Sequence, residues 1–151
     1  MIIALLRDTG YNIVLFLHVL TVIVSMAGAI AHPLMFGLEE QRPDGDLVAL
    51  ATRIQVPSRI YSISYALVGL IGFGLISMGD WGWGETWIWL SIVLWVVTLG
   101  LVHGMVVPAE RALAGGDLSV VPRLKQLGPA VSVLDLVVIF LMTVKPGGSA
   151  L

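Results

Sequence analysis

Apolar residues fall into four long stretches along this chain, separated by polar and glycine-rich segments. The first stretch has no charged residue between Asp8 and Glu39, and about 20 apolar residues are enough for a helix to cross a bilayer. The pattern predicts an all-α integral membrane protein folded as a four-helix bundle. Its expected spans cover residues 11–36, 60–78, 86–107 and 127–144.

Polar and small residues of the first span recur at alternating steps of three and four, which places them on one helical face. Lipid would surround a lone helix evenly, so a one-sided polar stripe favours a face directed toward a protein interior. We therefore expect the other three spans to pack around this face. The stripe consists of His18, Thr21, Ser25, Gly28 and His32.

Two polar connections follow the first and third expected spans. The first ends in residues 46–55, which have the pattern of a short amphipathic helix. Asp46 is a favourable N-cap for this helix, and Pro57 is expected to lie beyond its end. The second connection covers residues 108–127. We expect short interfacial helices in both connections.

The composition is that of an integral membrane protein. Of 151 residues, 58% are hydrophobic and 12% are charged, whereas soluble domains carry roughly 25% charged residues. This length predicts a single membrane domain covering residues 1–151. The net charge of −2 provides no basic surface for nucleic acid. The lack of cysteine excludes disulfides, thiolate metal sites and cysteine nucleophiles.

The distribution of basic residues predicts the orientation. The sequence starts without a basic segment or a small-residue cleavage site, so the first span is expected to be retained. Of the eight basic residues, only Arg7 and Lys145 lie on the side of the termini. Because basic residues favour the cytoplasmic side, we expect the first and third loops in the cytoplasm and both termini outside. The other six are Arg42, Arg53, Arg59, Arg111, Arg123 and Lys125.

The depth of each polar residue follows from its position in its span. With a rise of about 1.5 Å per residue, His18 falls in the outer half, and His32 falls near the inner end. His103 of the third span and Asp135 of the fourth also fall in the inner half. We therefore expect an inner cluster of these last three residues. Its expected rim consists of Arg59, Tyr61 and Glu110.

Asp135 requires a partner, because an aspartate inside a membrane costs about 2.5–3.5 kcal/mol even on lenient insertion scales. One interpretation is a proton or ion site, or a carboxylate that orients a histidine ligand. The other is a structural hydrogen bond to His103 or to a serine such as Ser132, one turn away.

Each histidine also has two interpretations. For His32, followed by Pro33, an interfacial position is favoured over a site role. For His103, inside a GxxxG pattern, an interhelical hydrogen bond is favoured over a ligand role. His18 is either a haem ligand or a hydrogen-bonded core histidine. No metal site, phosphate-binding loop or nucleophile motif is predicted.

The first span resembles that of the HemJ-type protoporphyrinogen oxidases, which are small four-span proteins. The segment LFLHVLTVIVSMAGAIAHPLMF carries the histidine, the Ala-Gly pair, the proline and the phenylalanine at matching offsets. These residues are His18, Ala27, Gly28, Pro33 and Phe36.

Over most of its length the chain is similar to a group of four-span bacterial membrane proteins of unknown function. The shared features are an LHV opening, a VPxxR-like segment (here VVPAER) and a VKP ending at residues 144–146. The chain is also similar to the copper-resistance D membrane domain. These resemblances imply a bacterial inner (cytoplasmic) membrane protein.

The HemJ resemblance implies haem b binding, with His18 as an axial ligand. The chain departs from that family in two places. WIWLSIV has no lysine early in the third span, and GPAVSVLD replaces an Asn-Glu-x-Pro segment before the last span. The opposite axial ligand is therefore unassigned.

Three functional hypotheses result. The first is a small haem-b-binding protein associated with membrane redox chemistry. The second is a non-catalytic accessory subunit or assembly factor, which would contact other membrane subunits or its own copies through glycine-rich helix faces. The third is a proton or metal-ion path that uses Asp135, His103 and His32. The bilayer is the expected environment in all three.

Overall fold

The computed structural model describes residues 9–79 and 81–147. This part of the chain consists of helices joined by short turns and contains no strand, which confirms the all-α class. The elements are α1 (Thr9–Gln41), α2 (Leu47–Arg53), α3 (Gln55–Met78), α4 (Thr86–Leu101), the π-helical turn η2 (Val102–Val106), α5 (Val107–Ala114), the 3₁₀ turn η3 (Leu118–Val120) and α6 (Val121–Val144).

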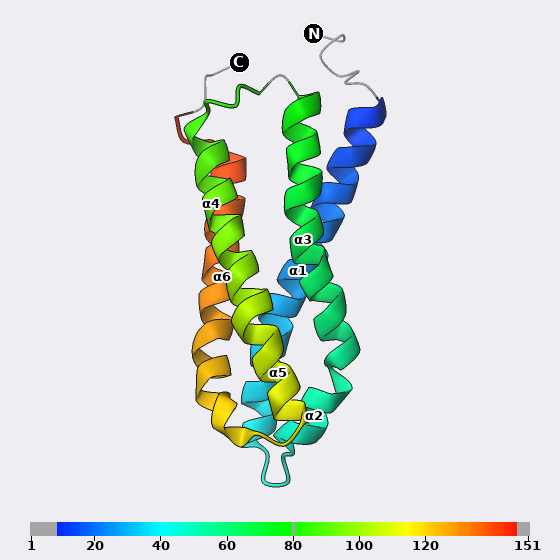
Figure 1. Ribbon diagram of the computed structural model, residues 1–151, viewed down its shortest axis with the longest axis vertical. Helices are drawn as coiled ribbons and strands as arrows, with labels where there is room; N and C mark the ends of the chain where they lie inside the picture. Colours follow the sequence, from blue (N-terminus) through cyan, green and yellow to red (C-terminus); the bar gives the residue numbers. More distant parts are fainter. Residues whose placement is uncertain (1–8, 80, 148–151) are drawn as a thin grey trace.

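Four helical segments within the described residues are long and apolar enough to cross a membrane. They are Thr9–Gln41, Gln55–Met78, Thr86–Ala114 and Leu118–Val144. Figure 1 shows them side by side along the long axis, with α2 and the connecting turns at one end. α1 packs mainly along α3 and α4 mainly along α6, while contacts between α1 and α6 join the two pairs. We call the end with α2 the inner end.

α1 is longer than the span expected from the sequence. It continues past residue 36 to Gln41 and includes Pro33, although a proline inside a helix removes the hydrogen bond to the carbonyl four residues earlier. That carbonyl belongs to Ala29, and it accepts a hydrogen bond of 3.0 Å from the hydroxyl of Ser132 on α6. The neighbouring helix therefore replaces the bond that Pro33 removes.

The first connection contains the predicted short helix. Asp46 is its N-cap, and the carboxylate accepts hydrogen bonds from the backbone N–H groups of Val48 and Ala49 at 3.0 and 2.9 Å. α3 then begins five residues before the expected position, because Pro57 falls in its first turn, where the missing N–H would be unpaired anyway.

The later spans also begin or end differently from expectation. Residues 108–114, assigned to a polar connection, continue the third span as α5, after the π-helical turn η2. α6 begins at Val121 instead of residue 127, with Pro122 in its first turn. In both places a proline lies in the first turn of a helix, where proline is tolerated, so it does not mark the end of a helix as expected.

Two glycines permit close helix approach. A side-chain carbon at Gly28 of α1 would collide with Tyr61 of α3, and one at Gly69 of α3 would collide with the indole of Trp95 on α4. The same indole donates a 2.7 Å hydrogen bond to the carbonyl of Tyr65. Small residues at these crossings therefore bring aromatic side chains into the interior, as in other membrane helix pairs.

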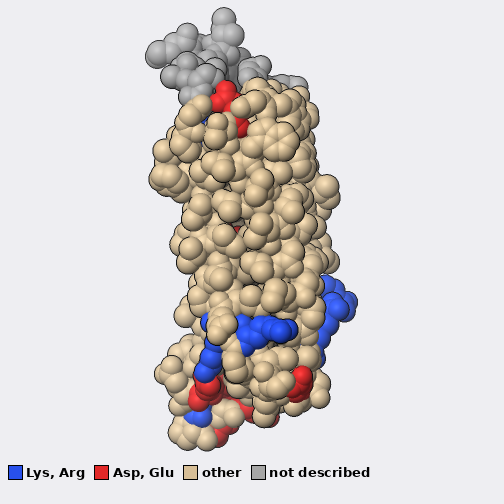
Figure 2. All heavy atoms as spheres, turned by 60° about the vertical axis from the view of Figure 1, so that its left-hand side comes forward, with Lys and Arg blue, Asp and Glu red and all other residues tan. Residues whose placement is uncertain are grey.

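Basic side chains gather near the inner end. Figure 2 shows them as a band, on the face in view, between a long surface with almost no charged residues and the end of the molecule where acidic side chains also gather. Lys145 lies at the opposite end, beyond the end of α6 at Val144, with its ammonium 3.7 Å from the centre of the Trp81 ring. Arg7 lies outside the described residues.

Candidate functional site

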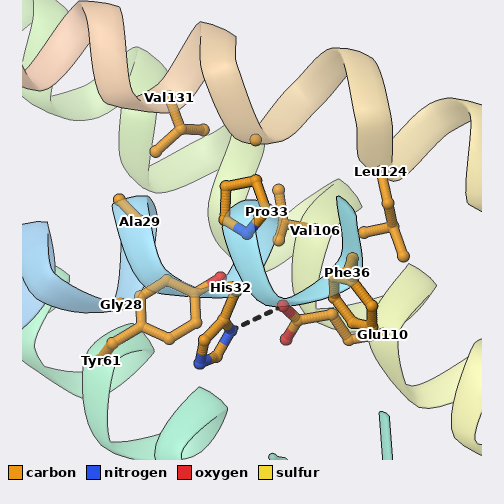
Figure 3. Close-up of a pocket in the computed structure, with 11 residues that line it drawn as sticks. Gly28, Ala29, His32, Pro33, Phe36, Tyr61, Val106, Glu110, Leu124 and Val131 are labelled. Atoms are coloured by element: carbon orange, nitrogen blue, oxygen red, sulfur yellow. Dashed lines mark hydrogen bonds and ion pairs between the residues drawn. The ribbon is translucent and has the colours of Figure 1, made fainter. Parts of the chain in front are cut away.

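Glu110 is the centre of a polar site at the inner end. Glu110 is buried, with only 1% of its surface exposed. One carboxylate oxygen lies 2.9 Å from Nδ1 of His32 on α1, and the other accepts a hydrogen bond from the hydroxyl of Ser58 on α3. Figure 3 shows the imidazole and the carboxylate pointing toward each other between these helices. Three helices therefore contribute to one buried polar contact.

The π-helical turn places Glu110 in the interior. At its end the N–H of Val107 bonds to the carbonyl of Val102, five residues earlier. Pro108 has no N–H, and its ring crowds the carbonyl of Gly104, which favours a wider turn here. Val106 and Val107 are consequently both buried, and α5 continues with Glu110 on its buried face.

Two tyrosines connect this contact to a second carboxylate. The ring of Tyr61 meets His32 edge-on, with 4.9 Å between ring centres, and lies 6.0 Å from the ring of Tyr65. The hydroxyl of Tyr65 donates a hydrogen bond to Asp135 on α6. We call the set of His32, Ser58, Tyr61, Tyr65, Glu110 and Asp135 the inner network.

A small cavity lies beside this network. Its volume is about 20 Å³, and His32, Tyr61 and Glu110 are among the residues that line it. One water molecule needs roughly 10–15 Å³ of such space. Figure 3 shows the cavity residues, with apolar side chains such as Val131 and Leu124 completing the wall. The cavity therefore has room for one water in contact with the network.

The outer half of α1 continues the polar lining. Its buried residues include Tyr11, His18, Ser25 and His32, spaced seven residues apart, so the predicted stripe does face the protein interior. His18 is 6% exposed, and its Nδ1 has no hydrogen-bond partner. The ring packs against α3, where a side-chain carbon at Gly72 would lie 3.3 Å from its Cε1.

The expected cluster of His32, His103 and Asp135 does not form. His103 is exposed on the outside of the third span, and its Nδ1 lies 3.2 Å from the carbonyl of Leu99 in its own helix. The sequence predicted the depth of His103 but not its direction around the helix axis. No group of three His, Asp or Glu side chains able to hold a metal ion occurs among residues 9–79 and 81–147.

The remaining predicted residues change their roles. His32, assigned to an interfacial position, is buried at 5% exposure. Asp135 does have a partner, but the partner is Tyr65 instead of His103 or a serine. Glu110, which was expected at the rim of the inner cluster, is the residue to which both His32 and Ser58 are hydrogen-bonded. The only signal in the sequence was a charged residue directly after an apolar segment, because the inward direction of Glu110 depends on the π-helical turn before it.

Breaking the pair of His32 and Glu110 should destabilise the protein. Removing one member of a buried pair typically costs about 3–5 kcal/mol, because the other is left without its partner. We expect His32→Ala and Glu110→Ala to destabilise the protein, and the double variant to lose less than the sum, with a coupling of about 0.5–3 kcal/mol. Unfolding by steric trapping in detergent measures this.

The pair of Glu40 and Lys125 provides the control for this cycle. It has a similar distance of 2.7 Å, but both side chains are about half exposed, so its coupling should fall within about 0–1 kcal/mol. Additive effects at His32 and Glu110 would contradict the geometry described above.

Comparison with known proteins adds no assignment. No protein-family model, curated protein or solved structure shows a significant match to this chain. The resemblance to the HemJ-type oxidases therefore stays a prediction, and the chemistry of the site is inferred from its own geometry.

Proposed function

We propose that this protein carries protons through the membrane along the buried face of α1, using the inner network. The observation that carries the proposal is the placement of two carboxylates, Glu110 and Asp135, inside the spanning segments, with a histidine and two tyrosines in contact between them. Ionisable residues are costly inside a membrane and typically occur where ions or protons pass. Of the earlier hypotheses, this is the third, without His103.

The chemistry of the network supports proton transfer. Imidazole and carboxyl groups bind and release protons, and a tyrosine hydroxyl both donates and accepts a hydrogen bond. A water in the cavity beside Glu110 would connect this carboxyl to Tyr61. Tyr65 then leads to Asp135. In the outer half, Ser25 and the unpartnered Nδ1 of His18 continue the line.

Proton flux into liposomes tests this proposal. The purified protein is reconstituted with a pH-sensitive dye inside the vesicles, and a potassium gradient with valinomycin sets the potential. We expect flux above that of empty liposomes, and we expect Asp135→Asn and Glu110→Gln to reduce it to the empty level, because an amide cannot carry the proton.

Ser91→Ala is the matched control for this experiment. Ser91 is a buried hydroxyl in the outer half of α4, and its Oγ has no hydrogen-bond partner, so flux should be unchanged. Circular dichroism and gel filtration check that each variant is folded. No flux from the wild-type protein, or full flux from Asp135→Asn, would contradict the proposal.

A second proposal is haem b binding at His18, with an associated role in membrane redox chemistry. The unpartnered, buried Nδ1 of His18 supports it, because such a nitrogen is available as an axial ligand. The space around the ring does not fit a macrocycle, since His18 is 6% exposed and even a single side-chain carbon at Gly72 of α3 would lie 3.7 Å from its Nδ1. The nitrogen could therefore bind haem, but the packing around it leaves no room for the macrocycle.

A visible spectrum distinguishes the haem proposal. If haem b is bound at His18, the dithionite-reduced minus oxidised spectrum of protein from haem-replete cells should show sharp bands that His18→Ala removes. A flat spectrum, or bands that persist in His18→Ala, would reject it. A colourless protein that co-migrates with a partner would instead favour the accessory-subunit alternative. A side-chain carbon at Gly100 or Gly104 would meet no atom within 4 Å, so this helix face is open to a partner helix, which supports the accessory-subunit alternative.

We also propose that the four spanning segments form a bundle in the bacterial cytoplasmic membrane, with the inner end in the cytoplasm and α2 at the interface. The band of basic side chains at the inner end supports this orientation, because such residues are retained on the cytoplasmic side. Both termini would then lie outside.

Cysteine labelling tests the orientation, because the chain has no cysteine of its own. Gly82→Cys places a thiol in the turn before α4, and Ser119→Cys places one in η3 at the inner end; both positions are exposed. A membrane-impermeant maleimide should label Gly82→Cys in intact cells and Ser119→Cys only after lysis. The reverse pattern would overturn the orientation.

A further inference from the structure

A groove lies between the inner ends of α1 and α6, next to the cavity beside Glu110, with which it shares Pro33, Phe36 and Leu124. Its volume is about 110 Å³. Pro33 and Phe36 line it from α1, and Leu124 and Pro129 line it from α6, while Glu40 and Lys125 stand at one end.

The polarity of the groove changes along its length. On α1, Glu40 lies about two turns closer to the inner end than Pro33, and on α6, Lys125 lies about one turn closer than Pro129. The charged pair is thus in the inner part of the groove, together with the apolar residues Leu47, Leu113 and Val121, and the part toward the middle of the membrane is lined by apolar residues. A phospholipid has its headgroup and acyl chain in the same order.

The charges at the rim identify the headgroup. Nζ of Lys125 lies 2.7 Å from the carboxylate of Glu40, and the side chains are 54% and 43% exposed. A lysine has three donors and a carboxylate has two acceptor oxygens, so each retains capacity for another partner. A phosphate would accept from Lys125, and a primary ammonium would donate to Glu40. A headgroup with only negative charge would be repelled by Glu40.

We propose that this groove binds one phospholipid with a primary-ammonium headgroup, of the phosphatidylethanolamine class. The acyl chain lies against Phe36 and Leu124, the phosphate binds Lys125, and the ammonium binds Glu40. The inference does not depend on proton transfer, since none of these residues belongs to the inner network.

Gly37 allows the groove to be blocked. It is one of the groove residues, and a side-chain carbon added there meets no other atom within 4 Å. Gly37→Leu should therefore fill space that an acyl chain would occupy, without a collision at the backbone. Gly100→Leu is the matched control, because a carbon at Gly100 on α4 also meets no atom within 4 Å, but this residue is not part of the groove.

Native mass spectrometry of the purified full-length protein tests the proposal. Delipidated protein in mild detergent is mixed with equal amounts of phosphatidylethanolamine, phosphatidylglycerol and phosphatidylcholine of identical acyl chains. We expect one phosphatidylethanolamine to be retained in preference to the others by the wild-type protein and by Gly100→Leu. Gly37→Leu and Lys125→Gln should lose it, and Glu40→Gln should lose the preference over phosphatidylglycerol.

Three results would overturn the proposal. Equal retention of all three lipids by the wild-type protein would indicate unspecific lipid around the helices only. Retention by Gly37→Leu equal to that of the wild type would place the lipid elsewhere. Preference of the wild-type protein for phosphatidylglycerol would reject the pairing of Glu40 with an ammonium. Gel filtration of each variant confirms that it is folded.

Discussion

The burial of Glu110 is the constraint on which the inner end of the structure depends. A carboxylate in a low-dielectric interior is tolerated only when hydrogen-bonding partners replace water. Its partners come from two other helices, His32 on α1 and Ser58 on α3. The inner ends of α1, α3 and α5 must therefore meet at one point. Tyr61 of α3 can pack against α1 there because Gly28 has no side chain.

Proline and polar residues act together in this arrangement. Pro33 frees the carbonyl of Ala29 inside the membrane, and Ser132 on α6 supplies the replacement hydrogen bond. Pro108 accompanies the π-helical turn that precedes Glu110. In both cases a locally unfavourable residue is accommodated by a neighbouring helix or a wider turn. The same contacts that join the helices also line the proposed path of protons.

Sequence patterns predicted the helical class, the four apolar segments, the inward polar stripe on α1 and the N-cap at Asp46. They did not predict the site, because depth along a span follows from residue number whereas direction around the axis depends on local helix geometry. The turn at residues 102–106 widens the helix and so changes the register of the residues after it, among them Glu110, which faces inward, while His103 within the turn is exposed. Tyr65, as the partner of Asp135, depends on packing between α3 and α6.

The central claim is that a carboxyl group of the inner network exchanges a proton with water. Infrared difference spectroscopy of the reconstituted protein between acidic and alkaline pH measures this directly, through the carbonyl stretch of a protonated carboxyl. We expect the wild-type spectrum to contain, beside the signal of the exposed carboxyls, a band that is lost in Asp135→Asn or in Glu110→Gln and retained in Ser91→Ala. A spectrum without such a band, or a band unchanged in both carboxyl variants, would contradict it.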